Sequence, residues 1–146
     1  MLLYRLSTKE WQDDLNGDSG REVDNFWTNA GNPCIYVHSS VASCLMENRM
    51  YYTLGEINPD MVMVEYEVPE SSLQVFEEEQ LPEDWRNDRK PSIARNFGTL
   101  RLQARETLLM AFPSVIMTGR ELVYIINPFH ALMKEVRITR VFKPLH

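Results

Sequence analysis

Residues 61–68 read Met-Val-Met-Val-Glu-Tyr-Glu-Val, and Pro69 follows them directly. Apolar side chains recur at every second position of this stretch, at Val62, Val64, Tyr66 and Val68. Glu65 and Glu67 lie between them, and this period of two is typical of a β-strand with one face buried and the other in water. Because proline cannot donate to a strand ladder, the stretch predicts a half-buried strand that ends at Val68.

Short apolar runs on both sides of this strand predict a sheet. They cover residues 2–6, 34–37, 108–112, 115–117, 122–126 and 136–142. Helices are predicted only at 8–15, from Ser39 or Ser40 to about Tyr52, and at 91–105. Strands outnumber helices and few alternate with them, so the sequence predicts an α+β fold rather than a doubly wound α/β fold.

Length and composition indicate one globular domain over residues 1–146. Hydrophobic residues make up 44% and charged residues 25% of the chain, which excludes collagen-like, mucin-like and wholly disordered proteins. A chain of this size buries about 68–70% of its unfolded surface, so it needs neither disulfides nor metal to fold. There is no internal repeat, and no apolar run reaches the roughly 18 residues of a membrane span.

The formal net charge of −6 argues against a general nucleic-acid binder, because Lys and Arg supply the affinity for a phosphate backbone. Residues 1–90 carry 7 Lys and Arg against 18 Asp and Glu, whereas residues 91–146 carry 8 against 3. This asymmetry favours an anionic ligand or acidic partner on the C-terminal part, or else two parts of one fold that neutralise each other. The acidic run at 77–79 and residues 81–86 after it predict a solvated loop.

The chain has two cysteines, Cys34 and Cys44. No basic and apolar leader precedes the first predicted strand, so we expect a cytoplasmic protein with reduced thiols. Cys34, Cys44 and His38 together offer three zinc ligands, but a structural zinc site takes four. We therefore expect no metal site, no Cys–His nucleophilic pair, and a structural, hydrogen-bonded His38.

Two segments predict a functional site. Residues 16–33 form a loop longer than the about 12–15 residues common in compact domains, and such loops are usually functional or disordered. The helix predicted after Ser40 is apolar around nearly its whole circumference and is expected to be largely buried. Glu47 is the exception on that helix, and a carboxylate in apolar surroundings needs a partner or a task.

A series of short motifs along the whole chain resembles the RES-domain family. In order they are Leu3-Tyr4-Arg5-Leu6, Asn32-Pro33-Cys34-Ile35-Tyr36, Glu47 eleven residues after that tyrosine, Leu81-Pro82-Glu83-Asp84-Trp85-Arg86, Phe112-Pro113-Ser114-Val115-Ile116 and Tyr124-Ile125-Ile126-Asn127-Pro128-Phe129-His130. Each piece alone is unspecific, but their full order with matching spacing is fairly specific.

The resemblance implies a RES fold similar to that of ADP-ribosyltransferase toxins. It also implies the toxin half of a bacterial type II toxin–antitoxin pair, in a hetero-oligomer with an Xre-type helix-turn-helix antitoxin. Such toxins degrade NAD as a substrate by cleaving its nicotinamide–ribose bond, with water or phosphate as acceptor. No further cofactor, no direct nucleic-acid contact and no membrane are implied.

The same resemblance assigns roles to five residues. Arg5, Tyr36 and Glu47 would be catalytic, while Ser114 and Asn127 would bind the substrate through its carboxamide or ribose. The residue types suit this chemistry, because a carboxylate stabilises an oxocarbenium-like ribose and an arginine binds a pyrophosphate with two hydrogen bonds. A tyrosine ring can stack on nicotinamide or ribose.

The residues by themselves leave simpler alternatives open. Tyr36 can be a packing residue, Ser114 can cap a turn, and Asn127, which precedes a proline, can belong to a turn.

One departure from the family pattern lies within the long loop. The family's Gly-Gly-Arg-Trp-Asn is matched here by residues 24–29, Asp-Asn-Phe-Trp-Thr-Asn, with Phe26 in place of the arginine. Trp27, Phe26 and the nearby Arg21 are the further substrate-binding residues that we expect. A lost guanidinium removes up to two phosphate contacts of about 1.5–3 kcal/mol each. The alternative is therefore a catalytically impaired or altered-substrate RES domain that binds a nucleotide or a partner. A third hypothesis is an interaction domain outside this family.

Overall fold

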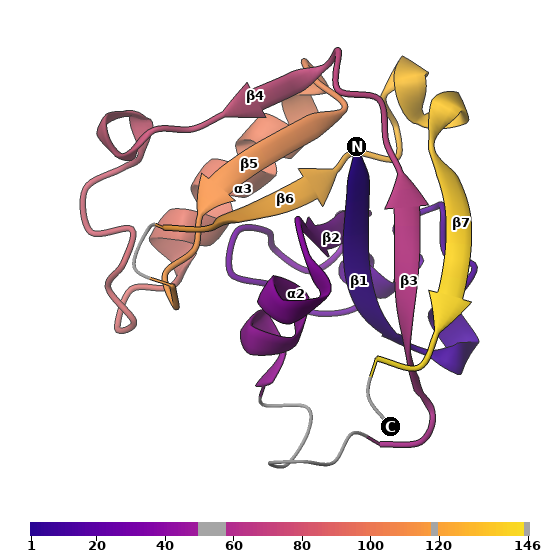
Figure 1. Ribbon diagram of the computed structural model, residues 1–146. Helices are drawn as coiled ribbons and strands as arrows, with labels where there is room; N and C mark the ends of the chain where they lie inside the picture. Colours follow the sequence, from indigo (N-terminus) through magenta and orange to yellow (C-terminus); the bar gives the residue numbers. More distant parts are fainter. Residues whose placement is uncertain (50–57, 118–119, 145–146) are drawn as a thin grey trace.

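A seven-stranded sheet forms the centre of the protein (Figure 1). The computed structural model describes residues 1–49, 58–117 and 120–144. The strands are β1 (Leu2–Thr8), β2 (Ile35–His38), β3 (Met61–Glu67), β4 (Leu73–Val75), β5 (Leu109–Pro113), β6 (Leu122–Ile126) and β7 (Arg137–Phe142). Their order in the sheet is β4-β5-β6-β2-β1-β3-β7, and all neighbours are antiparallel except β4 and β5.

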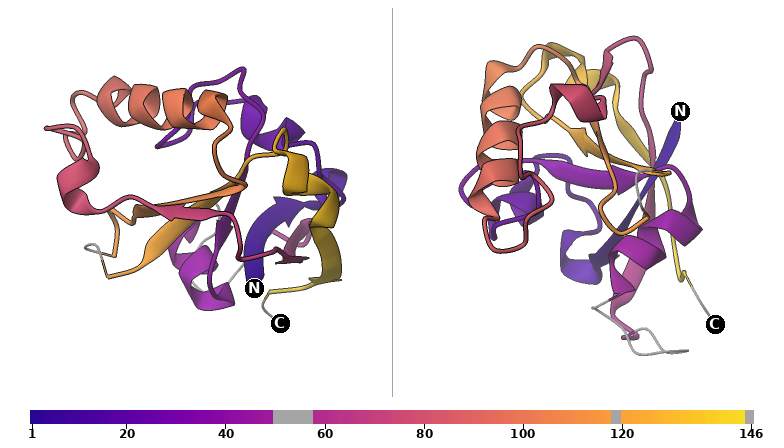
Figure 2. Two further views of the ribbon diagram at one scale, coloured as in Figure 1. Left: turned by 90° about the horizontal axis from the view of Figure 1, so that it is seen from above. Right: turned by 90° about the vertical axis from the view of Figure 1, so that its left-hand side faces the viewer.

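Few helices accompany the sheet, so the predicted α+β fold is confirmed. They are α1 (Asp18–Arg21), α2 (Val41–Glu47) and α3 (Ser92–Ala104), with the 3-10 turns η1 (Lys9–Trp11), η3 (Glu78–Gln80) and η4 (Ala131–Glu135). In Figures 1 and 2, α3 lies along the part of the sheet made by β4, β5 and β6, whereas α2 lies beside β1. None of the helices in the described ranges is both long and apolar enough for a membrane span.

The strand predicted at 61–68 is β3, but the prediction of a half-buried strand is wrong. Met63 and Glu65, on the face expected in water, are both buried. The reason is that β3 lies between β1 and β7 in the sheet and is covered on both faces. The cost of burying the Glu65 carboxylate is partly offset, because it accepts hydrogen bonds from Tyr4 Oη at 3.1 Å and Thr139 Oγ1 at 2.9 Å.

The helix predicted at 8–15 is reduced to the short turn η1. Asp14 explains this, because its carboxylate accepts the backbone N–H groups of the next segment instead of leaving them to a helix. Oδ1 accepts from Gly17 N at 2.9 Å and Oδ2 from Ser19 N at 3.1 Å. This is the local competition by which Asp side chains interrupt helices.

The helix predicted after Ser40 begins as expected but is shorter and more exposed than predicted. Ser40 Oγ accepts from Ser43 N at 3.0 Å and caps α2, which ends at Glu47. Tyr52, the predicted end, lies outside the described residues. Only Ser43 and Cys44 of α2 are buried and Met46 is 47% exposed, because α2 packs on β1 and β2 with one side only.

Two further predictions are corrected, and one strand was not predicted. Residues 115–117 are not a strand but a turn after β5, closed by the Ser114 N–H to the Glu121 carbonyl at 2.9 Å. The segment at 77–86 is not simply solvated, because Leu81 and Trp85 are buried in the core. Strand β4 was not predicted, since three residues show no recognisable period.

Two apolar clusters flank the part of the sheet near α3. One is mainly aliphatic and continues across the sheet to β1 and β3, and the other contains Trp27, Phe76, Trp85 and Phe112 against α3. Gly98 allows this contact, because a Cβ at that position would lie only 1.9 Å from the Trp27 carbonyl oxygen. The predicted helix at 91–105 is thus confirmed, and it packs on the long loop.

Opposite charges face each other where β3 meets β7. Glu65 is the register partner of Arg140, and Glu67 is the partner of Arg137. Facing pairs of this kind stabilise a sheet. They support the alternative in which the acidic and basic parts of the chain neutralise each other within one fold.

Candidate functional site

Two adjoining cavities lie between β1, β2, α2 and the loop at 16–33. The Arg5 cavity has a volume of about 350 Å³ and is also lined by Ser19 of α1. The Glu47 cavity has a volume of about 300 Å³ and is also lined by Phe26. Both are of a size typical of ligand sites. Four residues line both cavities, so the two adjoin and are together called the cleft below: Asn25, Tyr36, His38 and Asn48.

A separate hollow of about 380 Å³ is formed by the loop residues 78–87. None of the site residues predicted from the sequence lines it, so we take the cleft as the candidate site.

Arg5 is buried and rigidly placed in its cavity. Its Nε donates to Tyr66 Oη at 3.0 Å, Nη1 to Ser19 Oγ at 3.2 Å and Nη2 to the Trp11 carbonyl at 2.6 Å. None of the carboxylates in the described part of the chain forms an ion pair with it. Arg5 therefore presents an uncompensated positive charge that suits an anionic ligand.

Tyr36 lines both cavities and fixes the loop with its hydroxyl group. Its Oη accepts from the Trp27 N–H at 3.1 Å and shares a hydrogen bond with Thr28 Oγ1 at 2.9 Å. Burial raises the pKa of Tyr36 well above its usual value, so the phenol is neutral. The ring, rather than the hydroxyl group, is the part left to contact a ligand.

Glu47 and Ser114 are brought together from elements 67 residues apart in the chain. The Ser114 hydroxyl donates to Glu47 Oε1 and accepts from the Met117 N–H at 3.1 Å. Glu47 lines its cavity, whereas Ser114 is fully buried behind it. The serine therefore holds the carboxylate in place.

An aromatic column leads from the core to the Glu47 cavity. Trp27 stacks between Phe112 and Trp85, with ring centroids 4.3 Å and 5.2 Å away. Phe26 packs edge-on against Trp27 at 5.2 Å and is 41% exposed at the cavity. Phe26 and Trp27 thus both line the Glu47 cavity, and their role as substrate-binding residues stays a prediction.

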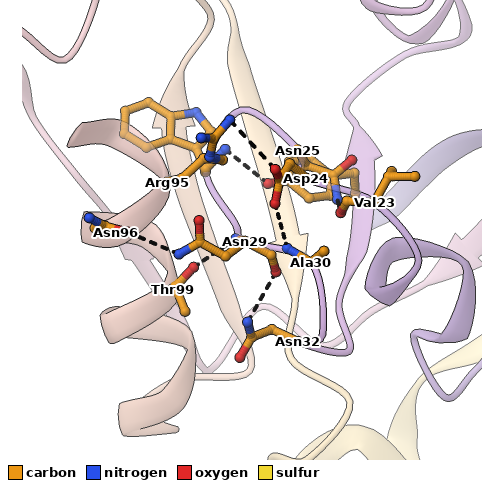
Figure 3. Close-up of polar contacts among 11 residues, drawn as sticks. Val23, Asp24, Asn25, Asn29, Ala30, Asn32, Arg95, Asn96 and Thr99 are labelled. Carbon is orange, nitrogen blue, oxygen red and sulfur yellow. Dashed lines mark hydrogen bonds and ion pairs between the residues drawn. The ribbon is translucent and has the colours of Figure 1, made fainter. Parts of the chain in front are cut away.

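The loop that carries these rings is anchored on α3, as Figure 3 shows. The Asn29 N–H donates to Thr99 Oγ1 at 2.9 Å, and its Nδ2 donates to Asn96 Oδ1 at 3.0 Å. Asp24 accepts from the Ala30 N–H at 2.8 Å. A loop that is unpatterned in sequence is therefore ordered by side-chain contacts.

Two predicted site residues lie outside the cleft. Arg21 pairs on the surface with Asp18 at 3.5 Å. The Asn127 side chain donates to the Leu102 carbonyl at 2.9 Å and accepts from the Phe129 N–H at 3.0 Å. The structure thus leaves Arg21 and Asn127 outside the cleft. It brings the other predicted site residues together in the cleft or directly behind it: Arg5, Tyr36, Glu47, Ser114, Phe26 and Trp27.

Sequence reasoning missed His38 and Asn48 as cleft residues. Tyr36 and His38 are two residues apart on β2 and so share a face, a signal that could have identified His38. The expectation that His38 is hydrogen-bonded is wrong for Nδ1, which is buried without a partner. Asn48, whose Nδ2 donates to the Cys44 carbonyl at 2.7 Å, belongs to no pattern that could have revealed it.

Cys34 and Cys44 are free thiols, and burial raises their pKa values to about 11 and about 12. Within the described ranges, no group of three or more His, Cys, Asp or Glu side chains is arranged to hold a metal ion.

Known proteins similar to this chain are bacterial toxins. A protein of Photorhabdus laumondii named Toxin Res is 24% identical over 142 residues, covering 94% of this chain and 90% of the relative. A Toxin Res of Pseudomonas putida is 29% identical and covers 94% and 92%. The Prs ADP-ribosylating toxin of Sphingobium is 29% identical and covers 92% and 84%.

The fold also matches a solved structure, the M. tuberculosis MbcT-MbcA toxin-antitoxin complex. The TM-score is 0.72 at 13% identity, over 98% of this chain and 84% of that chain. The RES domain matches residues 2–143. With that match over nearly its whole length, and with the ordered motifs and the fold in agreement, the chain belongs to the RES domain family.

Proposed function

We propose that this protein is the toxin of a toxin–antitoxin pair and degrades NAD by cleaving the nicotinamide–ribose bond. The observation that carries the proposal is one cleft with an uncompensated Arg5 guanidinium at one end and a Ser114-held Glu47 carboxylate at the other. Tyr36 lines both cavities. Names of the relatives add support, because several are toxins and one is an ADP-ribosylating toxin.

Each end of the cleft suits one part of the dinucleotide. Arg5 would bind the pyrophosphate, since a guanidinium is the preferred partner of phosphate oxygens. Glu47 would lie beside the reacting ribose and stabilise the positive charge that develops as the C1′–N bond breaks. Neutral nicotinamide leaves with the electron pair of that bond, water or phosphate adds to C1′, and the acceptor loses its proton to solvent.

A protein side chain is a second candidate acceptor. The observation that favours it is the Sphingobium relative, which is named an ADP-ribosylating toxin. The products distinguish the acceptors, because water gives free ADP-ribose, phosphate gives a phosphorylated sugar and a protein gives a mass increase on the target.

Phe26 supports the alternative of an impaired or altered-substrate domain. No Lys or Arg is present among the described residues that line the Glu47 cavity. Phosphate contacts at that end are therefore weak, whereas an aromatic ring could stack on the exposed Phe26.

An antitoxin partner is part of the proposal, because the structural match comes from a toxin-antitoxin complex. We expect an Xre-type antitoxin, a hetero-oligomeric complex and action in the cytoplasm. Co-expression with the product of a neighbouring helix-turn-helix gene, followed by size-exclusion chromatography, tests the complex.

The enzymatic proposal is tested by measuring nicotinamide release from NAD, with and without phosphate. We expect turnover by the natural protein and a roughly 100-fold or greater loss in Glu47→Gln, which keeps the shape but not the charge. Glu79→Gln, on the exposed acidic segment, is the matched control and should stay active.

Phe26→Arg tests the alternative of an impaired or altered-substrate domain. Activity in Phe26→Arg only would establish natural impairment, whereas inactivity of every variant would favour a binding domain.

A further inference from the structure

His38 lies at the junction of the two cavities and has no part in the chemistry described above. It follows Tyr36 on the same face of β2, and both residues line the Arg5 cavity and the Glu47 cavity. Its side chain is deeply buried, with the residue only 4% exposed. His38 is thus one of the four residues at the boundary that the two cavities share.

The hydrogen-bonding state of His38 is unusual for a buried polar side chain. Nδ1 is closed off without a partner, and neither ring nitrogen bonds to any residue in the described ranges. His130 shows the ordinary situation, because its Nδ1 accepts from the Leu132 N–H at 3.1 Å. Since buried polar groups are nearly always bonded, an unbonded imidazole on the wall of a cleft points to a partner supplied by the ligand, and because Nδ1 is closed off, Nε2 is the nitrogen that a ligand can reach.

The charge state of the ring selects the kind of group it can bind. Burial lowers the pKa of His38 to about 4, so the imidazole is neutral near pH 7. The Nε2 of a neutral imidazole either donates or accepts a hydrogen bond, and a hydroxyl group can pair with both forms, whereas an ionised phosphate can only accept. The charged residues on the cleft wall are elsewhere, with Arg5 in one cavity and Glu47 and Asp24 in the other.

We propose that His38 is a positioning residue that hydrogen-bonds a sugar hydroxyl of a nucleotide bound across both cavities. The inference rests on the proposed function for the identity of that nucleotide, NAD. It assigns the middle of the cleft to the sugar, between the phosphates at Arg5 and the reacting bond at Glu47.

The first test is a ¹⁵N NMR titration of the imidazole nitrogens, with ADP-ribose as the probe. The chain has three histidines, so the spectrum can be assigned with single variants. We expect ADP-ribose to shift the His38 signals and leave those of His130 unchanged, because the Nδ1 of His130 already has a partner. Nicotinamide, which lacks the sugar, should shift neither. ADP-ribose binding with unmoved His38 signals would overturn the inference.

The second test compares His38→Leu with His38→Asn and His38→Gln. Leucine removes the hydrogen-bonding group, so we expect KM for NAD to rise roughly 3- to 10-fold with little change in kcat. Gln, whose amide nitrogen lies about where Nε2 lies, should bring KM back toward the natural value, and the shorter Asn should do so less. A purely structural role predicts an unchanged KM in His38→Leu, whose fold is checked by circular dichroism and its Tm.

The two proposals fail in different ways. An ADP-ribose shift at His38 without NAD turnover retains the inference and contradicts the proposed function. NAD turnover with unshifted His38 signals and an unchanged KM in His38→Leu supports the proposed function and contradicts the inference about His38. No binding of ADP-ribose or NAD contradicts both.

Discussion

At the scale of single residues, the polar groups of the cleft divide into those that face a ligand and those that hold them. Arg5 and Glu47 line the cavities, while Ser19, Tyr66 and Ser114 fix their orientation. Catalytic groups that are fixed before the substrate binds need no reorganisation during the reaction. The supporting groups are therefore where conservative substitutions are most informative.

Ser114→Ala should reduce activity although Ser114 does not line the cleft. The change removes the donor to Glu47 and the acceptor of the Met117 N–H. We expect about 10-fold slower nicotinamide release and about 1–3 kcal/mol lower free energy of unfolding. Kinetics and urea unfolding measure the two effects, with the exposed Ser71→Ala as control. An unchanged rate with lowered stability would show that Glu47 needs no such support.

His38 should make the protein sensitive to mild acid. Its pKa is about 4 in the folded protein against 6.5 in the unfolded chain, so between these values the unfolded chain binds more protons and stability falls as the pH falls. The loss between pH 7 and pH 5 should be about 2 kcal/mol. Urea unfolding at both pH values should show a smaller loss in His38→Asn. Equal losses in both proteins would contradict the assignment of a buried neutral His38.

At the scale of secondary-structure elements, the close contact between α3 and the long loop shapes the Glu47 cavity. The loop has no internal pattern, and its order comes from contacts to Asn96, Thr99 and the surface around Gly98. This arrangement places Phe26 and Trp27 at the cavity.

Gly98→Ala tests that contact. Alanine is favoured over glycine in a helix by about 1 kcal/mol, yet its Cβ would lie 1.9 Å from the Trp27 carbonyl oxygen. We therefore expect a lower Tm and slower NAD consumption, because Trp27 must move. Leu100→Ala, on the exposed side of α3, is the control and should change Tm little. A higher Tm for Gly98→Ala would show that propensity outweighs the clash.

Charge reversal on β7 tests the register with β3. Arg137→Glu and Arg140→Glu would place like charges opposite Glu67 and Glu65. Each should lower the free energy of unfolding by about 0.2–1 kcal/mol, and more at low salt. Lys143→Glu, beyond the end of β7, should have a smaller effect. Equal effects of all three in urea unfolding would indicate a net-charge effect rather than specific pairing.

At the scale of the whole molecule, the site exists only after the sheet has formed. Arg5, Tyr36 and Ser114 lie on or next to β1, β2 and β5, which are far apart in sequence but are brought close by the sheet, where β2 pairs with β1 and only β6 lies between β2 and β5. Both cysteines are also buried in the folded protein.

The two thiols should be unreactive in the folded protein. With pKa values of about 11 for Cys34 and about 12 for Cys44, almost no thiolate is present at pH 8. A chromogenic disulfide reagent should react with both only after denaturation. In alkali the unfolded chain loses these protons first, from about pH 9, so stability should fall as the pH rises toward 11. Rapid labelling of the folded protein would contradict this burial.

The sequence alone was sufficient for the fold class, the main strands, the N-cap of α2 and the family. These depend on local period, capping chemistry and ordered motifs, which are properties of neighbouring residues. It was insufficient for the burial of Glu65, the turn at 115–117 and the end of α2. Those depend on which strand lies beside which and on what covers each face.

For the site, the ordered motifs pointed to Arg5, Tyr36, Glu47 and Ser114, but only the tertiary structure decided what each one touches. It showed Ser114 behind Glu47, Asn127 bonded to backbone groups outside the cleft, and His38 unbonded at its centre. The physical reason is that residue types and spacing are written along the chain, whereas hydrogen-bond partners and cavities are made between segments that meet only in the folded sheet.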